Sequence, residues 1–427
     1  MTDIAGAKEK KREVLSWCLY DWAYSSFATT VISAVLPVYY SQVAARNLTG
    51  NTATVYWGYT TAVALIASVL LAPVMGAIAD FSGIKKRLLL VFAAVGIFST
   101  ALLYYVTTGD WLLASVLFIF GNIGFSMSEV FYNALLPGIA NAQEIDRISV
   151  KGYALGYLGG GILLALDIGL IQIMEDKSLA TRITFITVSV WWAVFTIPLI
   201  MNVKEPVVRS RKKIDTGILT AGFRRLSVTF AELRKYRELF LFLAAFWIYN
   251  DGIGTIIKMA AIYGAEIGIS QSALIGALLM TQFVGIPFSF AFGRLAGYIG
   301  AKNSIMLGLF VYTIISISSY FMETALHFFI LAFLVGTVQG GTQALSRSLY
   351  GSMLPRDKTA EFFGFYGMSS KFAGIIGPLA FAIVSQATGT SRLSIISLIV
   401  FFIAGAIILS RVDIQKGISA SRDNSPV

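Results

Sequence analysis

Two long apolar runs of this chain end in the same pattern of small and basic residues: Gly76-Ala-Ile-Ala-Asp80-Phe-Ser-Gly83-Ile-Lys85 and, in the second half, Gly293-Arg-Leu-Ala-Gly297-Tyr-Ile-Gly300-Ala-Lys302. A pattern repeated at this distance indicates two copies of one structural unit. Membrane proteins built from such copies usually move a solute across the bilayer. The duplication therefore predicts a membrane protein made of two related halves.

Composition supports a membrane-embedded fold. Of the 427 residues, 56% are hydrophobic and only 13% are charged, which is too little polar surface for a soluble protein of this size. The apolar residues fall in blocks of the length that crosses a bilayer as a helix. The sequence thus predicts an all-α membrane protein with twelve transmembrane helices in two six-helix, pseudo-symmetric bundles. The expected spans are Leu15–Ala44, Thr54–Ala79, Leu88–Val106, Trp111–Pro137, Ser149–Met174, Ile183–Val203, Leu239–Ala265, Ser272–Leu295, Ser304–Met322, Leu326–Leu354, Phe362–Gln386 and Leu393–Leu409.

The spans divide the chain into four parts. Residues 1–203 form the first predicted bundle and residues 238–412 the second. Residues 204–237 are a basic linker, whose apolar residues at helical spacing favour an amphipathic helix on the membrane surface. A solvated linker is the alternative. Residues 413–427 are polar and are predicted to be a disordered tail.

The distribution of basic residues predicts the orientation. The net charge is +10, and 26 of the 33 Lys and Arg residues fall before the first span, after the last, or in the linker and alternate loops on the same side. The loops on the other side hold only Arg46, Lys177, Arg182 and Arg392. Cytoplasmic loops carry this excess, so both termini are expected in the cytoplasm. The basic groups then face anionic lipid heads, and no nucleic-acid partner is expected.

A family resemblance follows from several motifs. The loop Gly76–Arg87 resembles the signature loop of the major facilitator superfamily, between its second and third helices. Within that superfamily the chain resembles the vacuole effluxer-like branch, in the form found in bacteria. The segments that carry this resemblance are Tyr20-Asp21-Trp22-Ala23, Arg147-Ile148-Ser149, Gly156-Tyr157-Leu158-Gly159-Gly160, Tyr249-Asn250-Asp251-Gly252, Gln339-Gly340, Ser346-Arg347-Ser348 and Glu361-Phe362-Phe363-Gly364. The resemblance implies a polytopic transporter, and the fungal members are associated with amino-acid efflux from the vacuole.

Charged residues inside the spans mark candidate functional positions, because a charge at the centre of a membrane helix costs roughly 2.5–3.5 kcal/mol on insertion scales. Four are acidic and three are basic. Asp21 and Asp251 are the candidates for proton or substrate coupling, since low dielectric favours the protonated form of a carboxyl. Asp167 and Lys371 have two alternative interpretations: each is part of a structural ion pair, or each has a functional role. The seven residues are Asp21, Glu129, Asp167, Asp251, Lys258, Arg347 and Lys371.

Polar stripes point these residues toward one passage. Asn122, Ser126, Glu129 and Asn133 share one face of the fourth span, and Gln339, Gln343 and Arg347 share a face of the tenth. A helix exposed to lipid could not carry such stripes. The predicted substrate and coupling-ion residues are Asp21, Ser25, Glu129, Asn133, Asn250, Asp251, Lys258, Gln339, Gln343, Arg347 and Lys371.

An inner gate is also predicted. Glu129 lies eight residues before Pro137, and Arg347 lies eight residues before Pro355, so the two occupy matching positions in the repeat with opposite charge. We expect them to bridge the halves when the path is closed on the inside, with Asp21 in the same layer. A pair that only holds helices together is the alternative. In the signature loop, Asp80 is expected to stabilise one state of the gate. The gating residues are therefore Gly76, Asp80, Gly83, Lys85, Glu129 and Arg347.

Enzymatic chemistry is not indicated. The only histidine is His327 and the only cysteine is Cys18, so no histidine-based metal site or catalytic triad can be assembled. No phosphate-binding loop is present, which argues against ATP-driven pumping. We expect neither an enzyme nor a cofactor.

The sequence therefore predicts a secondary active transporter that works by alternating access in a bacterial plasma membrane. The mixture of carboxylates and basic groups suits an amino acid or another zwitterionic or carboxylate-bearing solute, with protons as a candidate coupling ion and a monomer as the expected state. A lipid or amphiphile translocase of the same fold, and a non-transporting receptor, are the alternatives.

Overall fold

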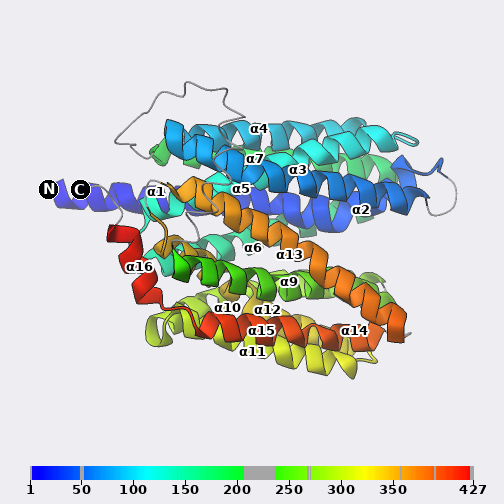
Figure 1. The fold of residues 1–427 in the computed structure, drawn as a ribbon. Helices are drawn as coiled ribbons and strands as arrows, with labels where there is room; N and C mark the ends of the chain where they lie inside the picture. The colour runs from blue at the N-terminus through cyan, green and yellow to red at the C-terminus, as the bar shows by residue number, and fades with distance from the viewer. Residues whose placement is uncertain are drawn as a thin grey trace.

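Helices make up every regular element within the residues that the computed structural model describes, which are 2–48, 52–141, 143–205, 236–266, 269, 271–355, 358–388 and 391–423. Eleven described segments are long and apolar enough to cross a bilayer, and α13 (Thr359–Thr388) is the twelfth span. The long helices lie side by side in two groups (Figure 1). The prediction of an all-α membrane protein with twelve spans is confirmed.

The first half contains six spans. The first span runs without a break through α1 (Thr2–Ser26), the π-helix η1 (Phe27–Val35), α2 (Leu36–Tyr39) and a second π-helical segment η2 (Tyr40–Ala44). Extended π-helix is rare and often marks a functional site. The other five spans are α3 (Thr52–Ser82), α4 (Lys85–Leu102, followed by the short η3, Leu103–Tyr105), α5 (Trp111–Ile139), α6 (Ile145–Ile173) and α7 (Lys177–Asn202).

The second half repeats this plan. Its spans are α9 (Arg237–Glu266), α10 (Gln271–Ile299), α11 (Ala301–Tyr320), α12 (Ala325–Ser352), α13, and a last span divided into α14 (Ser391–Ser397) and α15 (Ile399–Ser410). The predicted amphipathic helix in the linker falls on residues 206–235, which lie outside the described residues.

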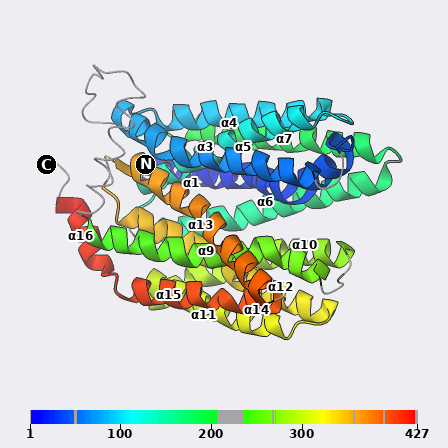
Figure 2. The same cartoon turned by 45° about the vertical axis from the view of Figure 1, so that its right-hand side comes forward.

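Both chain ends lie at one end of the bundle (Figures 1 and 2). We call this the terminal end; the turn between α3 and α4 and the helix α16 (Ile414–Asp423) are also there. The other end, with the loops before α7 and α12, is the opposite end. Between the halves, α3 packs on α13 and α6 packs on α10. A Cβ added at Gly364 on α13 would lie 2.6 Å from the carbonyl oxygen of Ala72 on α3, so these helix backbones touch directly.

The repeated sequence pattern forms a tight turn with one glycine in each half. Gly83 and Gly300 both have positive φ, at 64° and 83°, a conformation that favours glycine. After the first turn, Lys86 Nζ donates to the carbonyls of Ile200 and Val203, at 2.7 and 2.6 Å. After the second, Lys302 Nζ donates to the carbonyls at the end of the last span, Ser410 and Val412, both at 2.7 Å. Lys302, which aligns with Lys85 in the repeated pattern, thus makes the carbonyl contacts that Lys86 makes in the first half.

The tail departs from the prediction of disorder, because Ile414–Asp423 forms α16. The backbone N–H of Lys416 donates to the Asp413 carboxylate at 3.1 Å, which caps the helix start. Ile414 and Ile418, four residues apart, pack against the buried core, and the Asp413 N–H donates to Glu238 Oε2 at 2.7 Å. The polar composition of the tail concealed this short apolar stripe.

Candidate functional site

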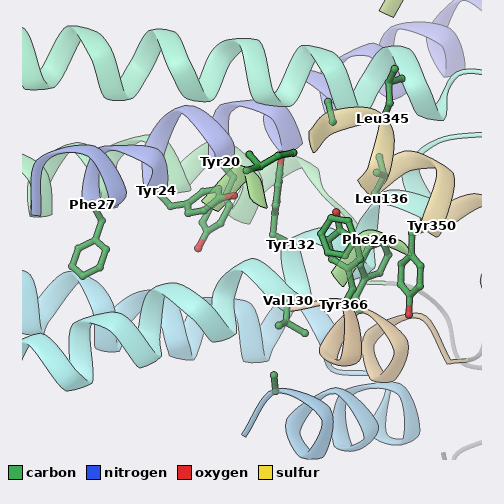
Figure 3. Close-up of a cluster of buried hydrophobic side chains, with 14 of the residues drawn as sticks. Tyr20, Tyr24, Phe27, Val130, Tyr132, Leu136, Phe246, Leu345, Tyr350 and Tyr366 are labelled. Atoms are coloured by element: carbon green, nitrogen blue, oxygen red, sulfur yellow. The ribbon is translucent and has the colours of Figure 1, made fainter. Parts of the chain in front are cut away.

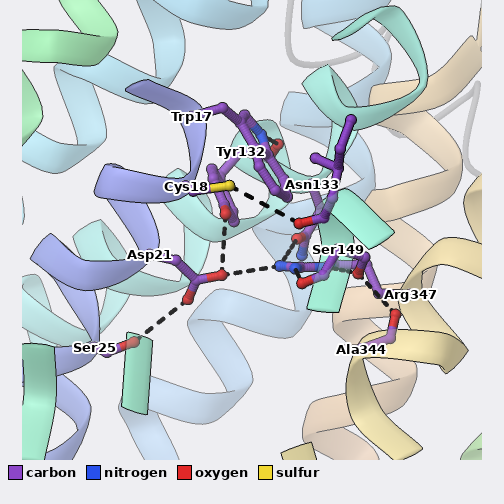
Figure 4. A network of polar contacts seen from close by, with 10 residues as sticks. Trp17, Cys18, Asp21, Ser25, Tyr132, Asn133, Ser149, Ala344 and Arg347 are labelled. Carbon is purple, nitrogen blue, oxygen red and sulfur yellow. Dashed lines mark hydrogen bonds and ion pairs between the residues drawn. The ribbon is translucent and has the colours of Figure 1, made fainter. Parts of the chain in front are cut away.

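Arg347 is the centre of a polar network between the two halves. It lies on α12 and is 1% exposed. Its guanidinium reaches three helices of the first half (Figure 4). Nη1 lies 3.2 Å from Asp21 Oδ2 on α1 and 3.3 Å from Asn133 Oδ1 on α5. Nε and Nη2 donate to Ser149 on α6, to the hydroxyl at 2.9 Å and to the carbonyl at 2.7 Å. One side chain thus joins the second half to three elements of the first.

Aromatic rings surround the same guanidinium. Its carbon lies 4.3 Å from the ring centroid of Tyr153, 5.0 Å from that of Trp17 and 5.5 Å from that of Tyr132. Trp17 and Tyr132 stack on each other at 4.2 Å, and the Tyr132 ring belongs to a larger aromatic cluster (Figure 3). Cation–π attraction is strongest where water is excluded. The rings therefore stabilise the buried charge and fix where it can lie.

Asp21 is held equally firmly. Its Oδ2 accepts from the Tyr132 hydroxyl at 3.0 Å as well as from Arg347, and Ser25 lies 3.4 Å from Oδ1. A Cβ at Gly156 would lie 2.7 Å from both Asp21 Oδ1 and Ser25 Oγ, so glycine is needed for α6 to approach this close. We call Asp21 and Arg347 the gate pair.

The pair differs from the predicted one. Sequence reasoning expected Glu129 to bridge to Arg347, but the structure pairs Arg347 with Asp21. Glu129 instead lines a cavity. The difference arises because Glu129 and Asn133 are four residues apart on α5: Asn133, one turn closer to the terminal end, meets the guanidinium, and Glu129 faces the space beyond it.

A second closure lies nearer the terminal end. Asp80 and Lys85 form an ion pair at 2.6 Å, and both side chains are at most 5% exposed. Lys85 Nζ also donates to the Thr359 hydroxyl at 2.6 Å. Asp80 Oδ2 accepts from the backbone N–H of Glu361 at 2.7 Å. The signature loop of the first half thus binds the start of α13, where free N–H groups favour an anion.

Gly76 and Gly83 have distinct roles in this closure. A Cβ at Gly76 would lie 2.9 Å from the Cα of Glu361 and closer still to Ala360, so Gly76 allows the two helices to touch. Gly83 supplies the positive φ of the turn.

A cavity of about 1180 Å³ lies on the other side of the gate pair. Its floor includes Asp21, Ser25, Glu129, Gln339 and Gln343. Its walls come from both halves and extend to exposed residues of the opposite end, such as Gln42 and Lys177. The cavity is larger than the roughly 300–1,000 Å³ of a typical ligand pocket, so a small solute would be accompanied by water. The structure is closed at the terminal end and open at the opposite end.

The remaining predicted residues divide into three groups. Asn250 and Asp251 are buried on α9, 9% and 1% exposed, but are not among the cavity-lining residues. The side chains of Lys258 and Lys371 lie outside the described residues. Asp167 is 1% exposed and accepts from the Thr187 hydroxyl at 2.6 Å; no ion pair of Asp167 occurs within the part of the chain that the structure describes.

Sequence reasoning missed several residues of the network, namely Trp17, Tyr132, Ser149, Tyr153 and Thr359. Ser149 stood within a motif that carried the family resemblance, so it could have been singled out. Tyr132 and Trp17 had no distinguishing signal, because aromatic residues are common throughout the spans.

The comparisons with known proteins agree with this architecture. A family model described as "Vacuole effluxer Atg22 like" matches residues 48–422. The chain is 39% identical over 417 residues to "Uncharacterized MFS-type transporter YxiO" of Bacillus subtilis, covering 96% of this chain and 97% of that protein. It is 24% identical over 449 residues to "Autophagy-related protein 22" of Yarrowia lipolytica, covering 84% of this chain and 75% of that protein.

Solved structures share the fold. The proton:xylose symporter XylE aligns with a TM-score of 0.76 at 13% identity, covering 96% of this chain and 97% of that one. A bacterial homologue of the iron transporter ferroportin, in an outward-facing state, aligns with a TM-score of 0.68 at 10% identity, covering 94% and 98%. At these identities the likeness shows the major facilitator fold alone.

Replacing one member of the gate pair should destabilise the protein. Asp21→Asn or Arg347→Met leaves the other charge buried without its partner, so each should lower the free energy of unfolding by about 3–5 kcal/mol. The double variant should lose clearly less than the sum of the two. Denaturant unfolding in detergent, followed by tryptophan fluorescence, measures all three variants. Glu9→Gln, in the exposed pair with Lys204, is the control and should change nothing measurable. Strictly additive losses would show that the pair is not energetically coupled.

Loosening the second closure should expose the only thiol. Cys18 is 0% exposed, with its Sγ 3.9 Å from the carbonyl of Ile148. Asp80→Asn removes charge-assisted contacts worth about 1.5–3 kcal/mol, so the terminal end should open more often. Alkylation of Cys18 by a soluble maleimide should then be at least about tenfold faster, since 1.4 kcal/mol is a factor of ten. Asp110→Asn, at the opposite end, should leave the rate unchanged. Equal rates in Asp80→Asn and wild type would contradict the role of this closure.

Proposed function

The chain belongs to the vacuole effluxer Atg22-like family and is a multi-pass transporter of the major facilitator type, and from this premise we propose that it moves an amino acid or another zwitterionic solute by alternating access. In this proposal the solute enters and leaves through the cavity between the halves, and the halves rock about it. Protons are the proposed coupling ion, and the working unit is a monomer.

The chemistry of the cavity floor supports a solute with an ammonium group. The carboxylates Asp21 and Glu129 lie there together with the amides of Gln339 and Gln343. Lys177, the basic residue among the described lining, is at the mouth. An ammonium group would find two carboxylates at the floor, and the amides can donate to a carboxylate. A cationic solute that has no carboxylate would leave the amide N–H groups of Gln339 and Gln343 without an acceptor.

One observation carries the proposal: Asp21 belongs both to the cavity floor and to the gate pair. A solute ammonium that binds Asp21 competes with Arg347 for the same carboxylate. Binding would therefore weaken the contact that closes the terminal end and shift the population toward its opening. A freed Arg347 could then receive the solute carboxylate. Recognition and gating would share one ion pair.

The proposed orientation follows from the basic residues. The basic residues Lys85–Arg87 lie at the terminal end, and the sequence predicts most other basic residues on the same side. The positive-inside bias favours the cytoplasm for this end. We place the chain in the plasma membrane of a bacterium, and the state described here then opens to the outside. The description of the family as an effluxer supports export as the direction of net transport.

Purified protein in proteoliposomes tests the proposal. A panel of amino acids on the outside should drive counterflow of a labelled amino acid loaded inside. Glu129→Gln removes a charged acceptor at the floor, so the concentration for half-maximal counterflow should rise roughly 10- to 150-fold, as expected for the loss of about 1.5–3 kcal/mol.

Glu323→Gln is the matched control, because Glu323 is exposed in the loop before α12 and does not line the cavity. It should behave as wild type. Movement of a fluorescent lipid without counterflow of any amino acid would instead favour a lipid translocase and reject the proposed substrate class.

A further inference from the structure

Asp167 is a buried carboxyl that neither the gate nor the cavity uses. It lies on α6, is 1% exposed, and is absent from the lining of the cavity. Its Oδ1 accepts from the Thr187 hydroxyl of α7 at 2.6 Å. Its Oδ2 is buried and has no hydrogen-bond partner among the described residues. A carboxylate oxygen left without a donor in a membrane helix is costly to keep ionised.

No described cation compensates this carboxyl. The elements that pack against α6 include α7, which carries Thr187, and η1. On α7, Lys177 Nζ is held by the carbonyls of Gln172 and Met174, both at 2.8 Å. The Arg182 guanidinium lies over the Tyr104 ring at 5.4 Å. The segment η1 contains no titratable residue.

The charges of the gate are far along the same helix. Asp21 meets α6 at Gly156, and Arg347 meets it at Ser149. Gly156 is eleven residues before Asp167, which is about 16 Å at 1.5 Å per residue. The other titratable residues of α6 all lie toward the gate; they are Asp146, Arg147, Lys151, Tyr153 and Tyr157. The titratable residues of α10 lie at the terminal end; they are Arg294 and Tyr298.

The surroundings of Asp167 suit a group that changes its exposure. Leu164 and Ile168, three residues before Asp167 and one after it, line the cavity, so the carboxyl belongs to a stretch of α6 that forms the wall of that space. The π-helix η1 contributes Thr29, Ile32 and Ser33 to the same wall. It also carries a second buried oxygen, Thr30 Oγ1, that has no hydrogen-bond partner in the described part of the chain. Because π-helical segments are frequent at functional sites, this wall is a suitable place for a moving contact.

We propose that Asp167, oriented by Thr187, is a proton-binding site separate from the gate pair. Oδ2 takes up a proton from the aqueous cavity when the wall shifts, Oδ1 keeps the hydrogen bond from Thr187, and the proton leaves when the other end opens. This role in coupling depends on the proposed transport function, whereas the protonation itself does not. A metal cation is less suited, because a sodium or calcium ion needs several oxygen ligands and Thr187 supplies the one hydroxyl seen to contact Asp167 among the described residues.

Infrared spectroscopy of the whole protein in lipid nanodiscs tests the site without any substrate. The difference spectrum between acidic and alkaline buffer should contain the carbonyl stretch of a protonated carboxyl in an apolar setting. Asp167→Asn should abolish that band, and Thr187→Val should move it to higher frequency because the carbonyl loses its hydrogen bond. Asp251→Asn, which alters another buried carboxyl, should keep it. The proposal would be overturned if the band persisted in Asp167→Asn or disappeared in Asp251→Asn instead. It would also be overturned if adding sodium at constant pH changed the intensity of the band.

Transport then tests the coupling. In proteoliposomes, Asp167→Asn should retain amino-acid counterflow, which needs no net proton movement, but should lose accumulation driven by a pH gradient. Unchanged gradient-driven accumulation in Asp167→Asn would overturn the coupling role. An absence of counterflow in wild type would instead reject the proposed substrate class and leave the infrared result to decide the protonation site.

Discussion

The buried ion pair between Asp21 and Arg347 is the constraint on which the closed end of this transporter depends. Taking two charges out of water is costly, and their attraction offsets that cost only when the geometry is good and the remaining hydrogen-bonding groups are satisfied. Here Ser149, Asn133 and Tyr132 supply those partners, and aromatic rings enclose the cation. Each partner comes from a different position along the first half, so the network is complete only when α12 lies against α1, α5 and α6 together. We therefore expect these contacts to form and break together when the end closes and opens.

The gate is asymmetric because the two copies of the duplicated unit have diverged. Glu129 and Arg347 lie at matching positions of α5 and α12, as do Tyr132 and Tyr350. Tyr132 donates to Asp21, whereas Tyr350 donates to the carbonyl of Phe362 at 2.8 Å. Both halves also turn at a glycine, Gly83 and Gly300, but Gly297 replaces Asp80 in the second copy. The second closure is therefore built once, from the first half onto α13. Divergence of the two copies has left one half to present the arginine and the other to receive it.

Sequence reasoning reached the spans and the family, because long apolar blocks and the signature loop are local signals. It also placed Asp21 and Arg347 in one layer and Asn133 on the polar stripe of the fourth span, since helical spacing fixes which residues share a face. It paired Arg347 with Glu129 instead of Asp21, because the rotation of one helix against another is decided by side-chain packing that spacing does not reveal. Ser149 and Thr359 act through contacts across the interface between the halves. Such contacts depend on how closely glycines such as Gly76 and Gly156 let the helices approach. The tail helix α16 was missed because its apolar stripe is only two isoleucines long.

Distances between spin labels test the central claim, that the gate pair holds the terminal end closed while the opposite end is open. With Cys18 replaced by Ala, one pair of labels at Arg87 and Asn303 reports the terminal end, and another at Glu175 and Leu326 reports the opposite end; all four positions are exposed. The account predicts that Arg347→Gln lengthens the first distance and shortens the second, as a rocking motion requires. Two distance distributions that stay the same as in the parent protein would contradict it.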